Sequence, residues 1–348
     1  MAYTTIDKPS DFFETKLYVG NESTNAITGL DFQPDWVWLK NRDTSYYHGL
    51  YDSVRGTGNT KSLYSNASEA EGQNSGNMNL ASFNSDGFTL GATSSTNIIN
   101  KSSQNHVSWN WKAGTSFTND ASSTGIGSID SAGSFNNDSG FSIVSYTGTG
   151  SAGTIKHGLN SVPSMIIIKV LTNTANDWVV YHQATGNNKS TFLNGTNAVS
   201  SNAFMNNTTP TSSVFSVDGS NYSSGSSRNY IAYCFAEKQG YSKFGSYTGN
   251  GNADGTFVYT GFKPAWVMVK RTDSANDWCL YDNKRDTYNV VQDKLQPNQT
   301  SAESDDTSMD FVSNGFKFRE TGGNFNASGG TYIYMAFAEN PFVTSTGV

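Results

Sequence analysis

The side chains that most often perform catalysis are sparse in this sequence and do not fall into a known catalytic spacing. Only four histidines occur among the 348 residues, and none belongs to a His-Glu-x-x-His zinc motif. No Gly-x-Ser-x-Gly nucleophile elbow occurs, and the glycine-rich residues 56–59 (GTGN) are not followed by the Lys-Ser/Thr of a phosphate-binding loop. We therefore expect the protein not to be an enzyme, and we name no catalytic residue.

A polysaccharide depolymerase would need two carboxylates about 5 to 9 Å apart across a cleft. Five acidic residues near the N-terminus are candidates for such a pair: Asp31, Asp35, Asp52, Glu69 and Glu71. The corresponding positions later in the chain do not keep an acidic pair, so a depolymerase is the least favoured function.

Carbohydrate binding fits the residue types better, because sugars are held by aromatic rings and by amide and carboxylate groups on loops. The triplet Asn-Asp-Trp occurs at residues 176–178 and 276–278, and Ser-Tyr-Tyr stands at the corresponding residues 45–47. The candidate ligand-binding residues are those of these triplets and one arginine in a following insertion: Asp177, Trp178, Asp277, Trp278, Tyr46, Tyr47 and Arg55. The alternative is that both tryptophans pack inward while the aspartates cap the turns.

Calcium is the only metal that deserves weighing. Residues 136–138 (NND) and 305–306 (DD) offer oxygen ligands of the kind that Ca²⁺ prefers. Asn and Asp also stabilise turns through their own side chains, which explains both segments equally well. We assign no metal site and no cofactor. The two cysteines, Cys234 and Cys279, are expected to be buried free thiols.

The elements that must position these residues are repeated three times. A strand-like phrase of Pro, a spacer, four apolar residues and Lys occurs at residues 34–40 (PDWVWLK), 163–169 (PSMIIIK) and 264–270 (PAWVMVK). Each phrase follows a Tyr-x-Gly segment by a similar distance. Such an internal repeat predicts three copies of one β module.

The repeated strands differ in which of their faces are apolar. The Pro-led strand is apolar on both faces, which predicts a central place in a sheet covered on both sides. Its final lysine is expected to lay its stem on apolar surface and to keep its ammonium in water. The last strand of each copy has one apolar face, formed by alternate residues. These faces are Val107/Trp109/Trp111, Ile231/Tyr233/Phe235 and Ile333/Met335/Phe337.

Composition and these boundaries predict an all-β chain with three modules. Charged residues are 15%, aromatic residues 13%, and glycines number 34, a mixture typical of many short strands with turns. We expect an N-terminal arm with the first module at residues 1–114, and a partly ordered Ser/Gly-rich connector at 115–140. The second module spans residues 141–239, and the third spans 240–348 with a short tail from 343.

Charge and hydropathy exclude some partners. The net charge is −7 without a basic cluster, which disfavours nucleic acid. The longest apolar run, residues 165–171, contains Lys169 and is far shorter than the ~20 residues of a spanning helix, so we expect no membrane insertion. Residues 1–8 lack the basic-then-apolar pattern of a secretory signal, which predicts synthesis in a cytoplasm.

Several segments resemble a repeat family in virion proteins of marine tailed bacteriophages, cyanophages among them. They are residues 32–42 (FQPDWVWLKNR), 50–56 (LYDSVRG), 108–114 (SWNWKAG), 140–150 (GFSIVSYTGTG) and 157–159 (HGL). The resemblance covers nearly the whole chain. It implies tail-fibre-like or lectin-like proteins with antiparallel β-sandwich modules of the concanavalin or jelly-roll type, and it carries no catalytic residues.

The resemblance and the repeats together predict a phage virion accessory protein, made in the host cytoplasm and located in the virion. In the leading hypothesis it is a tail fibre, fibre tip or surface attachment protein that recognises a host-surface glycan. The alternative is a capsid decoration, knob or tail-assembly protein with no ligand. The expected partners are other virion proteins, a host glycan and further copies in a homo-oligomer. The chain has no long shaft, heptads or collagen-like stretch, which favours a fibre tip, knob or decoration.

Overall fold

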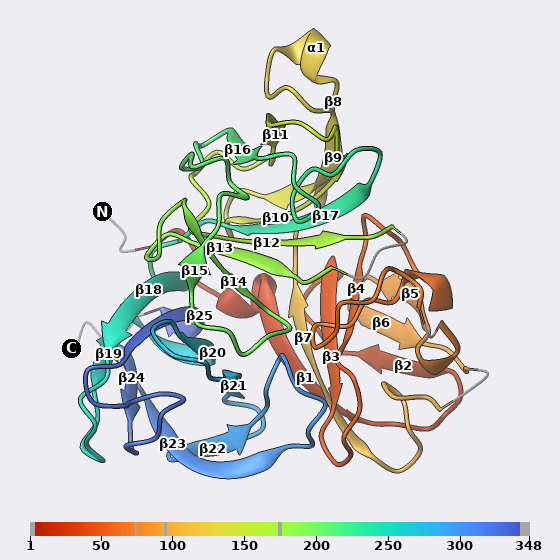
Figure 1. Cartoon of the computed structure of the whole chain (residues 1–348). Coiled ribbons are helices and arrows are strands. Elements are labelled where there is room, and N and C mark those ends of the chain that lie inside the picture. Colours follow the sequence, from red (N-terminus) through yellow and green to blue (C-terminus); the bar gives the residue numbers. More distant parts are fainter. Residues whose placement is uncertain (1–3, 74, 94–95, 173–175, 342–348) are drawn as a thin grey trace.

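Short antiparallel strands make up nearly all the regular structure in the computed structural model, which describes residues 4–73, 75–93, 96–172 and 176–341 (Figure 1). The predicted all-β class is confirmed. The helical elements of these residues have three or four residues each: η1 (Pro9–Asp11), η2 (Asn59–Lys61), η3 (Ser75–Asn77) and α1 (Ala121–Thr124). The predicted tail at residues 343–348 lies outside the described residues.

The strands follow the three repeats along the chain. Repeat one contains β1 (Phe13–Val19), β2 (Asn25–Thr28), β3 (Trp36–Asn41), β4 (Gly49–Asp52), β5 (Leu80–Asn84), β6 (Gly87–Leu90) and β7 (Asn105–Trp111). The connector contains β8 (Thr115–Asn119) and β9 (Ser131–Asn136). Repeat two contains β10 (Phe141–Thr147), β11 (Gly153–Lys156), β12 (Met165–Val170), β13 (Val179–His182), β14 (Lys189–Phe192), β15 (Ser200–Ser201), β16 (Val214–Val217) and β17 (Asn229–Phe235). Repeat three contains β18 (Ser242–Thr248), β19 (Phe257–Tyr259), β20 (Phe262–Arg271), β21 (Trp278–Asp282), β22 (Val291–Lys294), β23 (Ser304–Val312), β24 (Gly315–Phe318) and β25 (Thr331–Pro341).

The main sheets of the three repeats have the same strand order. It is β1-β7-β3-β4 in repeat one, β10-β17-β12-β13 within a larger sheet in repeat two, and β18-β25-β20-β21 in repeat three. The Pro-led strands β3, β12 and β20 each lie between two neighbours, and every residue of β3 and β12 is buried. The predicted central position of these strands is confirmed. Each repeat adds a small sheet: β2-β6-β5, β11-β16 or β19-β24-β23-β22.

Alternate side chains of each Pro-led strand serve two different cores. In β3, Val37 and Leu39 share a cluster with Phe88 of the small sheet of repeat one, whereas Trp36 and Trp38 face the middle of the molecule. The same division holds in β12 and β20, whose outward residues Ile166, Ile168, Val267 and Val269 lie in clusters with the small sheets of repeats two and three. Period-two alternation therefore joins each main sheet to its own small sheet and to the other repeats.

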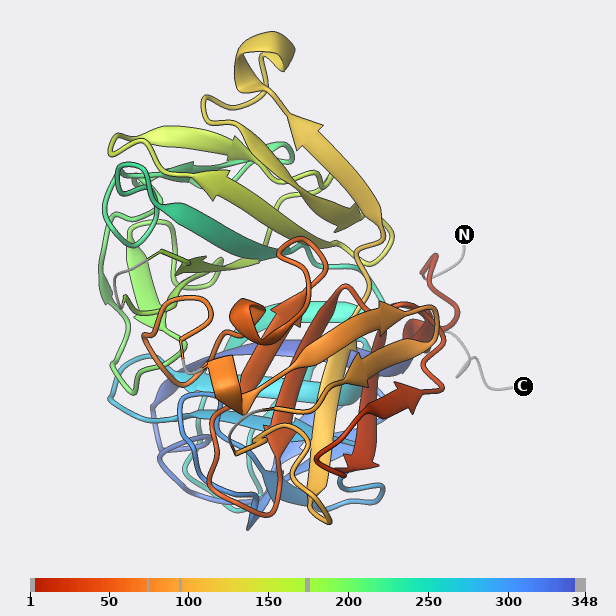
Figure 2. The same cartoon turned by 90° about the vertical axis from the view of Figure 1, so that its right-hand side faces the viewer.

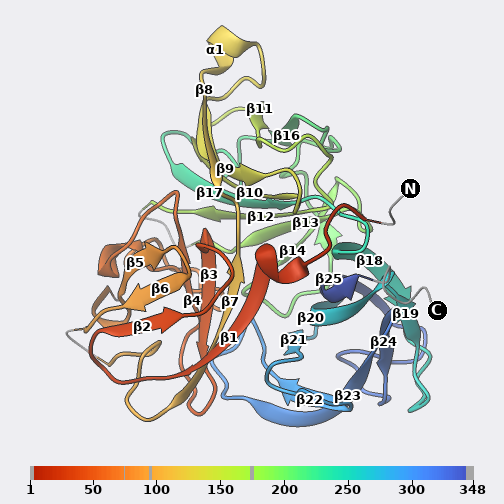
Figure 3. The same ribbon diagram turned by 180° about the vertical axis from the view of Figure 1, so that it is seen from behind.

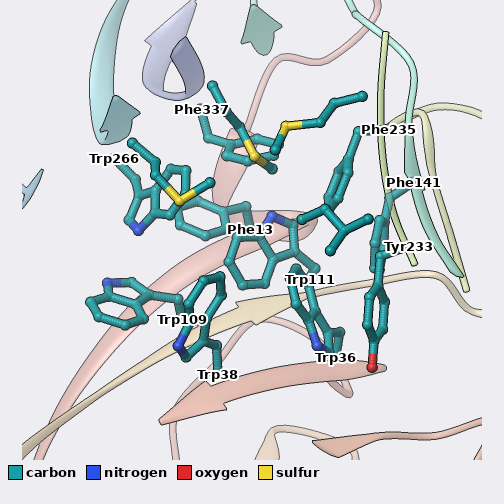
Figure 4. Close-up of a cluster of buried hydrophobic side chains, with 14 of the residues drawn as sticks. Phe13, Trp36, Trp38, Trp109, Trp111, Phe141, Tyr233, Phe235, Trp266 and Phe337 are labelled. Atoms are coloured by element: carbon teal, nitrogen blue, oxygen red, sulfur yellow. The ribbon is translucent and has the colours of Figure 1, made fainter. Parts of the chain in front are cut away.

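The three main sheets lie around the middle of the molecule (Figures 1 and 3). The side chains of their inward faces meet there in one central core (Figure 4). Trp36 stacks on Tyr233 at 4.4 Å between ring centroids, and Trp111 meets Trp266 edge-on at 5.8 Å. All nine residues of the predicted apolar faces lie in this core, which confirms the prediction. Aromatic rings from the three repeats thus pack against one another rather than against separate cores.

The Tyr-x-Gly glycines recur because only a hydrogen fits at these positions. A Cβ would lie 2.2 to 2.4 Å from a backbone oxygen in every repeat, well inside contact distance. The glycines and the carbonyl oxygens they face are Gly20 with Lys101, Gly148 with Gly225, and Gly249 with Ala327.

The connector extends the sheet of repeat two and projects from the body of the molecule (Figures 1 and 2). β9 pairs with β10 along its length, and β8 pairs with β9. Asp120 caps α1 by accepting a hydrogen bond from the Ser123 amide, and Gly125 ends this helix at φ +67°. The β8–α1–β9 hairpin, which we call the arm, therefore covers the β10 edge.

Removing one central ring is expected to destabilise the whole molecule. Trp36→Ala should lower the free energy of unfolding by about 3 to 5 kcal/mol, because the cavity would open where two repeats touch. The indole Nε1 of Trp36 is buried without a hydrogen-bond partner in the described part of the chain, so Trp36→Phe should cost much less. Urea-induced unfolding measures both variants, and equal losses would contradict the assigned role of the ring.

Candidate functional site

A lysine of each repeat reaches the preceding repeat by the same contact, and repeat one reaches repeat three. Lys169 Nζ donates to the Ser68 carbonyl of repeat one at 2.7 Å. The other two lysines close the ring: Lys270 donates to Thr196 of repeat two at 3.2 Å, and Lys40 donates to Thr300 of repeat three at 3.2 Å. The expectation that these ammonium groups lie in water is wrong, because all three lysines are 0% exposed. Backbone carbonyls replace the water that the charge would otherwise require.

Burial makes these lysines weaker bases. It lowers the pKa of Lys40 to about 7, with Glu303 opposing the shift. It lowers the pKa of Lys169 and of Lys270 to about 8, opposed mainly by Asp177 and Asp277 respectively. The two aspartates of the Asn-Asp-Trp turns therefore help to keep a buried ammonium charged.

A backbone hydrogen bond accompanies each lysine contact. The amide of Glu71 donates to the Leu171 carbonyl at 3.1 Å, and the amide of Val199 donates to the Thr272 carbonyl at 2.9 Å. At the third interface the amide of Glu303 donates to the Arg42 carbonyl at 2.8 Å. Each acceptor follows its lysine by two residues, so the repeat sequence fixes the whole contact.

The tryptophans of the Asn-Asp-Trp turns belong to these contacts as well. Trp178 Nε1 donates to the Tyr64 carbonyl at 2.8 Å, and Trp278 Nε1 donates to the Phe192 carbonyl at 2.9 Å. Their exposed fractions are 0% and 1%, and both lie in the central core. Both rings are buried, and the inward packing considered as the alternative is the arrangement found.

The strand register corrects the alignment of repeat one. Leu39 pairs with Gly49 as Val269 pairs with Cys279, so His48 is the residue of repeat one that is equivalent to Trp278. His48 Nε2 lies 3.1 Å from the Gln296 carbonyl, and Nδ1 accepts from Trp38 Nε1, so Nε2 carries the proton. Burial keeps the pKa of His48 well below its usual value. Sequence comparison misses this residue because an imidazole replaces an indole.

The remaining candidate residues do not come together in one site. Asp177 accepts from Asn194 at 2.7 Å, and Asp277 accepts from Asn298 at 2.6 Å, so both hold their turns. Tyr46 and Tyr47 are half-buried against the small-sheet cluster of repeat one, where the Tyr47 ring lies 5.0 Å from that of Tyr64.

The segments considered for calcium are engaged in other contacts. Asn136 Oδ1 accepts from the amides of Asp138 and Ser139 at 3.0 Å, and Asp306 pairs with Lys294. The described residues contain no cluster of three or more His, Cys, Asp or Glu that is arranged to hold a metal ion. Within the same residues, no helix has the length and apolarity to cross a membrane. Both cysteines are buried free thiols, as predicted.

Two open grooves lie beside the inter-repeat contacts. The first groove, between repeats one and two, has a volume of about 950 Å³. Its lining includes residues 145–149 of repeat two, residues 118–120 and 128–132 of the arm, and Arg55, Lys61, Glu71, Leu171, Asn229 and Tyr230. The second groove, between repeats two and three, has a volume of about 620 Å³. Its lining includes residues 246–248, 184–185, 272–273 and 331–333, with Lys189 and Val199.

Arg55 lines the first groove, but most of its side chain is engaged below the surface. Its Nε bonds Asp52 at 2.5 Å, its Nη1 bonds Glu71 at 3.1 Å, and only 3% of the side chain is exposed. Tyr233 of repeat two donates its hydroxyl to Asp52 at 2.7 Å. Burial opposes the charge, but the attraction of Asp52, Tyr233 and Glu71 raises the pKa of Arg55.

The sequence analysis assigned the arginine to an insertion of repeat one, but the Asp-x-x-Arg arrangement also occurs in repeat three. Arg285 Nε bonds Asp282 at 2.6 Å, and Trp109 of repeat one donates to the same carboxylate at 3.0 Å. In repeat two the residue equivalent to Asp52 and Asp282 is His182, whose Nε2 lies 3.2 Å from the Tyr334 carbonyl of repeat three. The signal was present in the printed sequence as Asp-Ser-Val-Arg and Asp-Asn-Lys-Arg.

The three interfaces differ at three equivalent positions. They carry Arg55, Glu71 and Leu171 at the first interface, Thr185, Val199 and Thr272 at the second, and Arg285, Glu303 and Arg42 at the third.

At the third interface, the Arg42 guanidinium bonds Glu303 at 2.5 Å and Asp293 at 3.3 Å. Burial and the neighbouring Glu303 raise the pKa of Asp293 to about 6. A bidentate ion pair therefore occupies the place that Leu171 and Thr272 leave open.

The grooves present hydrogen-bonding groups and few unpaired charges. Arg55 pairs with Asp52 and Glu71, and Lys61 pairs with Glu71 at 3.3 Å, so the two cations of the first groove are balanced by two carboxylates. Hydroxyl, amide and backbone groups of the Ser-Tyr-Thr strand and of the arm line the walls together with apolar side chains such as Ile129 and Leu171. Such a lining suits a neutral ligand rich in hydroxyl groups.

The buried lysines should make stability rise with pH. An unfolded lysine has a pKa near 10.4, so between about pH 7 and 8.5 the unfolded state binds more protons than the folded state. Each lysine then adds up to about 1.4 kcal/mol of unfolding free energy per pH unit. Lys40→Met should reduce this slope, whereas the exposed Lys189→Met should not. Urea unfolding at several pH values measures it, and an unchanged slope for Lys40→Met would refute the assignment.

Arg55 should contribute to stability through Asp52. Arg55→Met should lower the free energy of unfolding by about 3 to 5 kcal/mol, because Asp52 would stay buried without its counter-ion. The double variant Arg55→Met with Asp52→Asn should recover part of the loss, since it removes the unpaired charge. Thermal and urea unfolding give both values, and a loss below about 1 kcal/mol in the single variant contradicts this account.

The comparisons with known proteins place the chain in one family. Searches of the curated proteins and of the solved structures gave no match. A family model described as "Domain of unknown function (DUF7483)" matches residues 8–341, which include all three repeats and the connector. The chain therefore belongs to the DUF7483 family of domains of unknown function.

Proposed function

We propose that this protein is a phage virion accessory protein that attaches to the host surface by binding a neutral glycan in the first groove. The observation that carries the binding part is the groove itself, about 950 Å³ of open space whose lining mixes apolar surface with hydroxyl, amide, carboxylate and backbone groups. The virion part is supported by the resemblance of residues 32–42, 50–56, 108–114, 140–150 and 157–159 to phage proteins.

A glycan fits this groove better than an anionic ligand. Arg55 and Lys61 are already paired with Glu71, while Asp120 and Asp130 add negative charge on the arm. A phosphate or sulfate would therefore meet repulsion without a free cation to offset it. Sugar hydroxyls both donate and accept, so they match Thr147, Asn229 and the carboxylates at once.

The proposal includes a finer interpretation of the fold. Each repeat is a small antiparallel β-sandwich of the concanavalin or jelly-roll type, fused to its neighbours through the central core. The supporting observation is that each main sheet shares a buried cluster with a smaller sheet of its own repeat. Two sheets packed face to face on an apolar layer are the general plan of a sandwich.

Assembly without a ligand is the second candidate function, and the sheet edges favour it. β1 and β18 are the outer strands of their main sheets, whereas the equivalent β10 is covered by the arm. Leu17 and Val19 of β1 are 38% and 58% exposed. An edge of this kind can pair with a strand of another virion protein or of a second copy.

The variant Leu171→Arg tests the proposal with a change that the chain itself suggests. The equivalent Arg42 fills the third interface by pairing with Glu303, and Glu71 offers the same partner to an arginine at position 171. On an array of neutral glycans, Leu171→Arg should lose binding at least tenfold. The matched control Leu171→Met keeps an apolar side chain of similar volume and should bind normally.

Three results would each overturn a part of the proposal. Purified virions that lack the protein by mass spectrometry would remove the virion role. Virions that contain it, together with a wild-type protein that binds no glycan on the array, would favour the assembly function instead. Retained binding by Leu171→Arg would move the glycan site away from the first groove.

A further inference from the structure

We infer that the second groove is a second glycan site, so that one chain binds two neutral glycan segments. This inference rests on the proposed function and extends it from one site to two. The second groove lies between repeats two and three and has a volume of about 620 Å³.

The same strand forms one wall of both grooves. Residues 145–147 and 246–248 both read Ser-Tyr-Thr, and they occupy equivalent positions on β10 and β18. The residues at the ends of these segments, Thr147 and Thr248, are both exposed. The hydroxyl and backbone groups that the first groove offers along this wall are therefore repeated in the second.

A stacked pair of tyrosines supports each wall in the same way. Tyr146 lies on Tyr230 with ring centroids 5.1 Å apart and 9° between the planes, and Tyr247 lies on Tyr332 at 4.9 Å and 6°. The hydroxyl groups of the two wall tyrosines are held in the same way. Tyr146 donates to the Ser223 carbonyl at 2.6 Å, and Tyr247 donates to the Phe325 carbonyl at 2.7 Å. The wall is thus preorganised in both places.

The floor of the second groove is less charged than that of the first. Thr185 and Val199 stand where the first groove has Arg55 and Glu71, and the same backbone hydrogen bond joins Val199 to Thr272. Asp273 at the rim is paired with Arg271 at 2.9 Å and also accepts from the Thr331 amide. These replacements leave a polar floor without a charged side chain. The exposed Lys189 also lines the groove and can donate hydrogen bonds to sugar hydroxyls, so the expected ligand is again a neutral, hydroxyl-rich sugar.

The third interface explains why we infer two sites rather than three. Leu17 and Val19 replace the polar residues of the Ser-Tyr-Thr wall there, and Arg42 with Glu303 occupies the floor. The loss of the polar wall and the filling of the floor occur at the same interface. The first and second grooves therefore share a polar wall and an open floor that the third interface does not have.

Two weak sites are useful together. The tyrosine rings of the first groove are stacked and at most 5% exposed, so a sugar there is held mainly by hydrogen bonds. Exchange of such bonds with water yields little net free energy, which predicts weak binding in one groove. Two grooves on one rigid chain raise the apparent affinity for a glycan-coated surface by about a hundredfold or more.

Native mass spectrometry with four neutral hexasaccharides tests the inference: maltohexaose, cellohexaose, laminarihexaose and chitohexaose. With at least one of them, the wild-type chain should bind up to two molecules. Thr248→Trp fills the second groove and Thr147→Trp the first, so each variant should bind one molecule and the double variant none. Both threonines are exposed, and circular dichroism checks that the variants fold. Thr272→Arg places a guanidinium at the position of Arg42, with Val199 in place of its partner Glu303, and provides a second, steric way to close the second groove.

The outcomes separate this inference from the proposed function. Binding of one molecule that Thr147→Trp abolishes, but that neither Thr248→Trp nor Thr272→Arg weakens, would overturn the second site and leave the first. Absence of any bound hexasaccharide would overturn the second site for neutral sugars, while the glycan array with Leu171→Arg decides the first separately. Support requires at least a tenfold loss of binding at the second groove in Thr248→Trp or Thr272→Arg.

Discussion

The shared central core is the constraint on which the rest of the structure depends. Each main sheet has an inward face of large apolar side chains, and its own small sheet covers only the other face. A single repeat would leave rings such as Trp36, Tyr233 or Phe337 in water, at a cost of several kcal/mol. The repeats therefore stabilise one another, and the aromatic layer that would make one repeat insoluble unites the three.

The polar contacts follow from this burial. Where three sheet ends converge on an apolar centre, the lysines and backbone carbonyls at those ends lose their water and must find protein partners. The same contact provides these partners at all three interfaces: Lys40, Lys169 and Lys270 each donate a hydrogen bond to a backbone carbonyl of another repeat. A directional contact repeated around a closed ring also fixes the order of the repeats, which hydrophobic burial alone does not specify.

The sequence predicted the strands better than it predicted the contacts between repeats. Period-two alternation assigned all nine inward residues of the last strands, because side-chain alternation is a local property of a strand. It did not predict the burial of the lysine ammonium groups, because their carbonyl partners lie between 74 and 260 residues away in the sequence. The role of His48 was hidden for a similar reason: a ring N–H that donates to a carbonyl can come from imidazole or from indole, and only the strand register shows the equivalence.

The same logic shows where function can differ between the repeats. Residues of the central core and the three lysines that link the repeats contact two repeats at once, so a change there disturbs all three repeats. Positions 42, 171 and 272 lie at its outer margin, where the backbone carbonyl makes the conserved contact and the side chain is free to differ. Arginine at this position fills one interface with an ion pair, and leucine or threonine leaves the other two open. An interface held together by backbone atoms can thus contain an open groove without loss of the contact that stabilises it.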